Sequence, residues 1–440
     1  MRKTIICGKE IKDKFEKNQV FDLDLSLGSG EFGLTFDQIS KHLMFLGSPG
    51  TGKTNAINIL IDELLRKKST RDSLFIFDTK GDFYREFGNR SCKKLVISNE
   101  YPKSACWNIF GEIMDFDQNT VYYDKKNEIF SREIAKMLFA DKESDHQPFF
   151  HNAASDIVSK VILYFLRQAK NMDDTSILNN YFLANFLKTA SKEDLLRILA
   201  SKENPDFRGA IEYINCDDGQ SQGVLSFIKE MAADLLVGVF GGYEDSQDRK
   251  NQFSIRKLVK EKAYDVVFID YDISASKAQA PIYKVIVDLL LKFSMSGRED
   301  FRNRVYLILD EISLLPKLNY LSDGLTFGRS RGLRIIAGIQ SVDLIYDTYG
   351  SHLGNVIISN FMNVIVFYLS DAVSRDFVSK YFGLAYQDFN FSSGNGYCNT
   401  QREGYVVEDW DILKLSMGQA FVKLAGLDPI KYRFRIFKED

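Results

Sequence analysis

The sequence predicts an α/β fold: a central, mostly parallel sheet with an inserted all-α domain. Three observations predict it. Short, continuously apolar runs recur along the chain, as in the buried strands of a parallel sheet. A glycine-rich loop joins the first of these runs, Leu43–Leu46, to a predicted helix. Between about residues 125 and 235, apolar residues instead recur with the 3.6-residue period of helices.

The glycine-rich loop has the spacing G-x-x-x-x-G-K-[ST], which is typical of a phosphate-binding (Walker A) loop. Its glycines let backbone N–H groups turn around a phosphate, and the helix that follows directs its positive end at the same anion. Lys53 can reach the β- and γ-phosphates, and the Thr54 hydroxyl can bind Mg²⁺. An ordinary glycine turn is the alternative, which the flanking strand and helix disfavour. The predicted nucleotide-binding residues are Gly47, Ser48, Pro49, Gly50, Thr51, Gly52, Lys53 and Thr54.

Composition excludes several classes of protein. A chain of 440 residues is too long for one compact core. The five cysteines form no C-x-x-C pair and the four histidines show no ligand spacing, which argues against a zinc site or a disulfide scaffold and favours the reducing cytoplasm. A net charge of −3 argues against a broadly basic nucleic-acid binder, although DNA in a locally positive channel stays compatible. Neither a signal peptide nor a membrane span is predicted.

The second apolar run, Leu74–Phe77, ends in the polar cluster Asp78-Thr79-Lys80-Gly81-Asp82. Sheets of this class place ligand groups at the carboxyl ends of their strands, but a surface turn is an equal alternative. Further along, we interpret Trp107 as a packing residue rather than a base-stacking one. We expect His151 at a helix surface or an interface rather than in a catalytic role.

The change of period gives three predicted segments. Residues 1–124 form the N-terminal part of a nucleotide-binding domain, 125–235 an all-α insertion, and 236–440 the C-terminal part of the nucleotide-binding domain. The basic residues of the charged Gly241–Gln252 loop are candidates for lining a DNA pore. The segment at residues 420–426 is expected to be a closing edge strand.

The strand predicted at residues 304–309 ends in two adjacent carboxylates, Asp310 and Glu311. Such a pair is costly unless a cation or a water network uses it. With a phosphate loop upstream, it predicts a Walker B element. Asp310 would hold the Mg²⁺ shell, and Glu311 would be the general base for the attacking water. A solvated strand end is the alternative.

Two further residues complete the predicted catalytic set of Lys53, Glu311, Arg329 and Gln340. Arg329 lies in a glycine-framed turn and could stabilise transition-state charge at a neighbouring subunit's γ-phosphate, with a basic surface turn as the alternative. Gln340 ends the next strand and could sense the γ-phosphate. The order of these elements along the chain (loop and helix, strand, helical insertion, strand, Walker B strand, then two further strands) predicts a RecA-like sheet. The lack of an N-K-x-D guanine signature makes ATP the expected nucleotide.

Taken together, the motifs resemble the type IV secretion and conjugation coupling proteins, the TraD and TrwB group within the FtsK–HerA superfamily. The similarity runs from about residue 35 to the C-terminus. The motifs that carry it, in the family's order, are Gly47–Thr54, Ile76–Phe83, Trp107–Phe110, Phe149–Ala154, Leu309–Glu311, Gly328–Arg329, Ile339–Ser341 and Tyr349–Gly350.

The resemblance implies an ATP- and Mg²⁺-dependent homo-hexameric ring that moves single- or double-stranded DNA. By position it assigns the arginine finger to Arg329 and the γ-phosphate sensor to Gln340. The sequence departs from the family in lacking a predicted membrane anchor and an acidic tail. We therefore expect a cytoplasmic protein, with recruitment to the membrane by a partner left open. Two alternative functions are a HerA-like motor that acts with a nuclease, as in defence against foreign DNA, and a nucleotide-gated scaffold. A relaxase and a membrane-anchor subunit are further candidate partners.

Overall fold

The computed structural model describes residues 2–15, 19–101, 104–114, 124–140, 148–242, 252–271, 276–297, 299–393 and 396–437. The chain divides into two compact units. The first unit comprises Met1–Ser91 and Ser294–Asp440, and the second comprises Cys92–Phe293. The predicted helical insertion, residues 125–235, falls inside the second unit.

A mostly parallel sheet forms the core of the first unit, with strand order β16-β15-β12-β4-β11-β10-β5. The strands from β12 to β5 run parallel, whereas β15 and β16 are antiparallel additions. The parallel strands are buried on both faces, which is why they read as continuous apolar runs. Their bounds are β4 Leu43–Leu46, β5 Ser73–Asp78, β10 Val305–Leu309, β11 Leu333–Ile339, β12 Asn363–Val366, β15 Gln419–Lys423 and β16 Ile430–Arg433.

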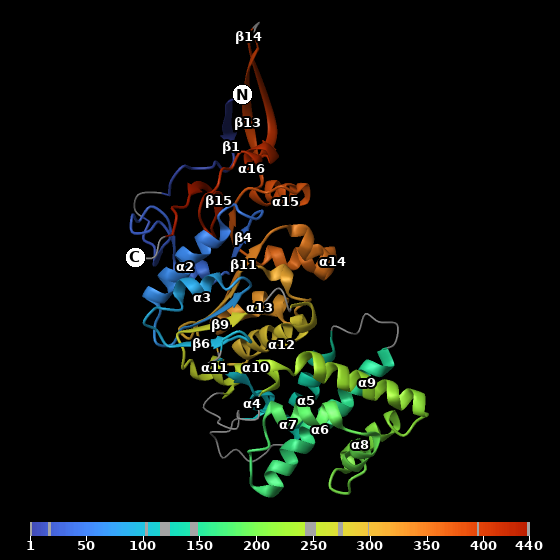
Figure 1. Cartoon of the computed structure of the whole chain (residues 1–440). Coiled ribbons are helices and arrows are strands. Elements are labelled where there is room, and N and C mark those ends of the chain that lie inside the picture. The colour runs from blue at the N-terminus through green and yellow to red at the C-terminus, as the bar shows by residue number, and fades with distance from the viewer. Residues whose placement is uncertain are drawn as a thin grey trace. The chain divides into compact units, whose positions relative to one another are not determined.

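Helices cover both faces of this sheet (Figure 1). Right-handed crossovers place α2, which connects β4 to β5, on the face opposite to α13 and α14, which precede and follow β11. The helices of the first unit are α1 Phe36–Ile39, α2 Lys53–Lys67, α3 Asp82–Phe87, η5 Ile312–Leu314, α13 Leu321–Phe327, η6 Gly328–Arg331, α14 Val342–Ser359, α15 Ala372–Phe382 and α16 Asp409–Leu413.

Two features of the first unit differ from the expectation or were not expected. The segment predicted as the edge strand forms β15, but β16 pairs with its outer side, so β15 is internal. A long hairpin of β13 (Leu384–Ser393) and β14 (Gly396–Tyr405) pairs with β1 (Arg2–Cys7) at the N-terminus (Figure 1). The sequence of the hairpin lacks a continuous apolar run, although an Asn-Gly dipeptide in that stretch of the sequence was a usable hairpin signal. A short pair, β2 (Leu23–Asp24) and β3 (Gly33–Leu34), completes the strands that the structure describes in this unit.

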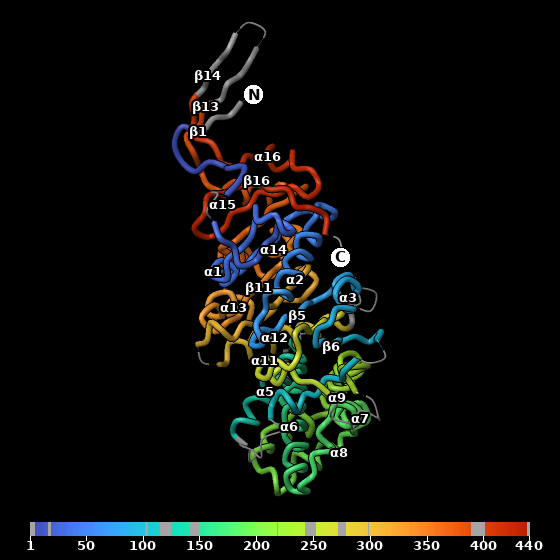
Figure 2. The backbone as a smooth tube through the Cα atoms, turned by 90° about the vertical axis from the view of Figure 1, so that its left-hand side faces the viewer, coloured from blue at the N-terminus to red at the C-terminus, as the bar shows by residue number. Residues whose placement is uncertain are grey.

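The second unit is dominated by helices, and α5 to α9 gather into one body (Figure 2). Contacts join α5 to α6, α6 to α9 and α7 to α9. Its helices are α4 Ile109–Ile113, α5 Asp124–Phe139, α6 Pro148–Met172, α7 Asn180–Thr189, α8 Lys192–Leu199, η2 Pro205–Tyr213, α9 Asp218–Leu235, α10 Gly238–Gly241, α11 Ile255–Glu261 and α12 Ser276–Met295. Its strands are β6 Lys94–Ile97 and β9 Val266–Asp270, paired in parallel, and β7 Cys106–Trp107 and β8 Gln252–Phe253, also paired in parallel.

Two expectations for the second unit can be compared with the structure, and a third falls outside the described residues. Trp107 is buried and its indole N–H donates to Glu112 at 2.8 Å, which confirms a packing role. His151 was expected at a helix surface or an interface; it is buried on α6 with its ring against Phe227 of α9, so it lies at an interface between two helices and not at an exposed surface. Arg249 and Lys250, the basic residues of the predicted pore loop, lie outside the described residues.

Candidate nucleotide-binding site

The predicted nucleotide loop continues directly from β4 at the carboxyl edge of the parallel strands. The Gly47 N–H donates to the Ile339 carbonyl at the end of β11 (3.1 Å). The Ser48 N–H donates to the Tyr368 carbonyl, just after β12 (2.9 Å). The loop is therefore anchored between the ends of the two strands that flank β4. Asp310 follows β10 at the same edge, because β10 runs parallel to β11.

Left-handed backbone conformations shape the loop. Gly50 has φ +74° and Gly52 has φ +112°, values that side-chain-bearing residues rarely adopt. A Cβ atom at Gly52 would also lie 3.2 Å from the Cα of Gly418, whose N–H donates to the Thr51 carbonyl. The Thr51 hydroxyl donates to the Ser48 carbonyl at 2.8 Å. These contacts hold the loop in place, and left-handed glycines of this kind occur in the backbone turns that bind anions.

Lys53 is the first residue of α2, and its side chain folds back over the loop. Its ammonium is buried and donates to the carbonyl oxygens of Gly47 and Ser48, the latter at 3.3 Å. Burial lowers the pKa of Lys53, and the nearby charges of Glu311 and Asp310 oppose that shift. A buried ammonium held by loop carbonyls is placed to receive a phosphate, which would supply the negative partner that stabilises its charge.

The two carboxylates predicted to form the Walker B element are buried close to Lys53. Asp310 is 7% exposed and Glu311 is 5% exposed. Burial raises the pKa of Asp310 to about 6, against the lowering effect of Lys80, and the charge of Glu311 raises it further. Burial also raises the pKa of Glu311, while hydrogen bonds from Ser313 and Gln340 lower it. The desolvated pair is thus placed to gain from a cation.

The structure brings Gln340 close enough to Glu311 for its side chain to lower the pKa of that carboxyl. Gln340 follows β11, the strand beside β10, so the two residues leave neighbouring strands at one edge. The predicted sensor therefore lies beside the predicted general base.

The polar cluster after β5 contributes two residues that the predicted site did not include. Because Phe77 pairs in register with Leu309, the ends of β5 and β10 lie side by side. The buried Thr79 hydroxyl lies 3.5 Å from an Asp310 carboxylate oxygen, and Lys80 lowers the pKa of Asp310. The signal was present in the polar residues at a strand end, but a surface turn fitted it equally well.

The residues available for Mg²⁺ are the Thr54 hydroxyl and the Asp310 carboxylate. Both are hard oxygen donors, and the Asp310 carboxylate is buried, with the Thr79 hydroxyl 3.5 Å from one of its oxygens. Among the described residues, no three His, Cys, Asp or Glu side chains gather to form a metal cage. The donor set fits Mg²⁺, which usually keeps several waters and substrate phosphates as ligands.

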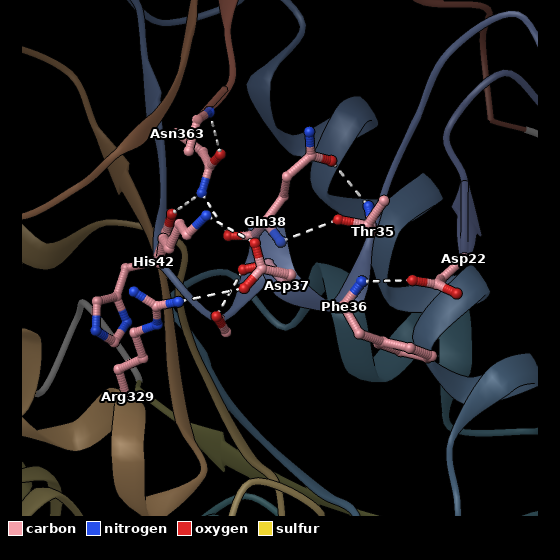
Figure 3. A network of polar contacts seen from close by, with 11 residues as sticks. Asp22, Thr35, Phe36, Asp37, Gln38, His42, Arg329 and Asn363 are labelled. Carbon is pink, nitrogen blue, oxygen red and sulfur yellow. Dashed lines mark hydrogen bonds and ion pairs between the residues drawn. The ribbon is translucent and has the colours of Figure 1, made fainter. Parts of the chain in front are cut away.

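Arg329, the remaining predicted catalytic residue, lies apart from this group. It belongs to η6, which precedes β11, whereas the loop and Gln340 follow the carboxyl ends of the strands. Its guanidinium is paired with Asp37 of α1 (Figure 3). The structure therefore brings Lys53, Asp310, Glu311 and Gln340 together at the carboxyl ends of the strands. Arg329 lies at the opposite side of the same sheet, by the amino-terminal ends of the strands.

Gly338 is a structural requirement of this site that the sequence analysis did not identify. A Cβ atom there would lie 1.9 Å from the carbonyl oxygen of Asp310. We expect Gly338→Ala to push the end of β10 outward, destabilise the protein by about 1–3 kcal/mol and lower nucleotide turnover. Thermal unfolding and turnover would be compared with Gly209→Ala, where the added methyl group meets no atom within 4 Å. A Gly338→Ala protein with unchanged melting temperature and turnover would contradict this requirement.

The fold and the gathered side chains define a P-loop nucleotide-binding protein with a RecA-like sheet. The family model of the type IV secretion-system coupling protein DNA-binding domain matches residues 28–426. The chain belongs to this family, which confirms the resemblance predicted from the sequence. No curated protein gives a match.

Solved structures share the fold of this chain. The unbound bacterial conjugative coupling protein TrwBdeltaN70 is 20% identical, with 99% of this chain and 94% of that chain covered and a TM-score of 0.73. Plasmid coupling protein TrwB in complex with the non-hydrolysable ATP analogue ADPNP is 19% identical, with 99% and 95% covered and a TM-score of 0.71. VirB4 of Thermoanaerobacter pseudethanolicus is 12% identical, with 98% and 99% covered and a TM-score of 0.55. These likenesses confirm the predicted fold class.

Among the helices that the structure describes, none combines the length and the apolar character needed to span a bilayer.

Proposed function

We propose that the protein is an ATP-hydrolysing motor that translocates DNA as a homo-hexameric ring of the coupling-protein type and acts in the cytoplasm. One observation carries the proposal: a buried lysine, two buried carboxylates and a glutamine meet at the nucleotide loop, while an exposed arginine lies at the opposite edge of the sheet. This arrangement is expected of a ring in which each chain supplies the nucleotide loop of one site and the arginine of the next site.

Each residue at the loop has a defined task. Backbone N–H groups of Gly47–Thr54 and the Lys53 ammonium bind the ATP phosphates. Thr54 and Asp310 would hold Mg²⁺, which would supply positive charge that neutralises the phosphates. Glu311 accepts the proton of the attacking water, and Gln340, hydrogen-bonded to it, orients that water and reports the γ-phosphate. A raised Glu311 pKa strengthens the carboxylate as a base.

Arg329 acts in trans for a geometric reason. It precedes β11, whereas Gln340 and the nucleotide loop lie beyond the carboxyl ends of the strands. The seven residues of β11 separate the two edges by roughly 20 Å at about 3.3 Å per residue, which is beyond the reach of a side chain. Arg329 therefore serves a neighbouring subunit's γ-phosphate rather than its own.

The family description supports DNA as the translocated partner, because it names a DNA-binding domain. The solved relatives support ATP and Mg²⁺: TrwB has been captured with ADP and Mg²⁺ and with ADPNP. A nucleotide-gated scaffold, in contrast, needs neither a general base nor an arginine finger.

The general-base assignment is tested by Glu311→Gln. The amide keeps the shape of the side chain and its place in the site but cannot accept the water proton, so we expect hydrolysis to fall by about 10²–10⁴-fold. ATP should still bind, because the loop and Lys53 are intact. DNA-stimulated hydrolysis and equilibrium binding of ATP would be measured.

Glu299→Gln, a change at an exposed residue of the same unit, is the control and should keep the wild-type rate. If Glu311→Gln hydrolysed ATP within a few-fold of the wild-type rate, Glu311 would not be the base.

A further inference from the structure

Asp37 contacts the proposed arginine finger directly (Figure 3). Its Oδ1 accepts a hydrogen bond from Arg329 Nη2 at 3.2 Å, and its Oδ2 accepts one from Lys41 Nζ at 2.7 Å. The contact uses a single guanidinium nitrogen. The Arg329 side chain is 44% exposed and that of Asp37 is 65% exposed, so the pair lies where another subunit can approach it.

The position of Asp37 is set by the short helix α1. Thr35 and Gln38 form a reciprocal capping box that fixes the start of this helix. Its end is held by the buried Asn363, whose side-chain amide donates to the carbonyl oxygens of Gln38 (2.6 Å) and His42 (2.7 Å). Asp37 is therefore presented by a helix whose two ends are both tied down.

His42 joins this helix to the elements that carry Arg329. Its Nδ1 accepts the Ile335 N–H of β11 at 3.0 Å, and its Nε2 donates to the Leu325 carbonyl of α13 at 3.1 Å. α13 leads into η6 and β11 leaves it, so His42 touches both elements that flank Arg329. Burial lowers the pKa of His42 to about 3, so the neutral ring and its acceptor nitrogen persist near neutral pH.

We propose that Asp37 is a positioning residue for Arg329, holding the guanidinium at the sheet edge in readiness for the γ-phosphate of a neighbouring subunit. This inference rests on the proposed function. In this role the Arg329 guanidinium must move from Asp37 to the phosphate. Lys41 makes this movement feasible, because the Asp37 carboxylate then keeps a cationic partner. Since both members of the pair are exposed, exchanging one anion for another has a small energetic cost.

The expected benefit is entropic. A free arginine side chain samples many rotamers, and ordering it at the transition state slows the reaction. Without Asp37, we expect kcat to fall by about threefold to tenfold, since part of that ordering is no longer made in advance. KM for ATP should change less than about twofold, because the residues that bind ATP are at the other edge of the sheet.

The test compares Asp37→Asn with Asp37→Glu and with Asp376→Asn, which removes a similarly exposed carboxylate paired with Lys380 on α15. DNA-stimulated kcat and KM would be measured on the full chain. We expect only Asp37→Asn to show the full loss of kcat, with Asp37→Glu recovering part of it. A wild-type kcat for Asp37→Asn would overturn the inference.

Mixed rings locate the defect. Lys53→Ala chains still donate Arg329, and Arg329→Ala chains still bind ATP, so mixing them should restore turnover. Adding Asp37→Asn to the Lys53→Ala chain should reduce this restored rate threefold to tenfold, as estimated for the ring above. Adding it to the Arg329→Ala chain should leave the rate unchanged. The positioning role would be overturned if Asp37→Asn lowered the rate on the Arg329→Ala chain and left it unchanged on the Lys53→Ala chain.

Failure of the inference and failure of the proposed function give different results. If Arg329→Ala alone retained wild-type turnover, the finger assignment would fail and the positioning role with it. If Arg329→Ala were inactive while Asp37→Asn were unaffected, only the positioning role would fail.

Discussion

Replacing Lys53 with alanine is expected to abolish ATP turnover, by at least about 10³-fold, because it removes the buried cation that stabilises charge developing on the transferred phosphate. The ammonium lies among carbonyl oxygens of the loop and close to Asp310 and Glu311. Without it, an incoming γ-phosphate would face two carboxylates with no opposing charge from this helix. Steady-state hydrolysis with saturating DNA and Mg²⁺ is the measurement.

Lys67→Ala is the matched control, since Lys67 is exposed in the last turn of the same helix and should be dispensable for turnover. Melting temperatures of both variants would confirm that α2 remains folded. Turnover by Lys53→Ala at more than a few per cent of the wild-type rate would contradict the assignment of the loop.

Arg329→Ala should reduce turnover by about 10³–10⁵-fold, the range for loss of an arginine finger. The loss should appear only where rings assemble, because Arg329 lies at the opposite sheet edge from the nucleotide loop of its own chain. Hydrolysis would be measured over a range of protein concentrations that spans assembly. Arg331→Ala is the control, since Arg331 lies in the same short helix and bonds instead to the Gly297 carbonyl.

Mixing gives a quantitative form of this prediction. In rings formed at random from equal amounts of Arg329→Ala and Lys53→Ala chains, roughly a quarter of the interfaces join an intact nucleotide loop to an intact finger. If sites act independently, the mixture should recover roughly that fraction of wild-type turnover, although each variant alone is inactive. Failure of any mixture to recover activity would indicate that Arg329 acts within its own chain or not at all.

The parts of the site that the sequence predicted are local in the chain. Gly47–Thr54 can be recognised because loop, lysine and hydroxyl lie within eight consecutive positions. Asp310 and Glu311 can be recognised because two acids end an apolar strand. The domain boundaries and the roles of the site residues stay predictions, whereas the family and the fold class are confirmed.

The parts that the sequence did not predict depend on strand order. Thr79 reaches Asp310 only because β5 is the neighbour of β10. Gly338 matters only because the carbonyl oxygen of Asp310, which follows the neighbouring strand, occupies the place where a Cβ atom would lie. Asp37 meets Arg329 across 292 positions of the chain, through a short helix with no catalytic motif of its own. The pattern of apolar residues within one segment does not indicate which distant segment lies beside it, so these contacts could not be predicted from the sequence.

The central claim is that the chain forms a DNA-stimulated ring ATPase whose sites are completed in trans. The most direct test is the rate of ATP hydrolysis as a function of protein concentration, with and without single- and double-stranded DNA. The account predicts a cooperative rise of the rate per chain with concentration, increased further by DNA. A slow rate that is independent of concentration and indifferent to both forms of DNA would contradict it.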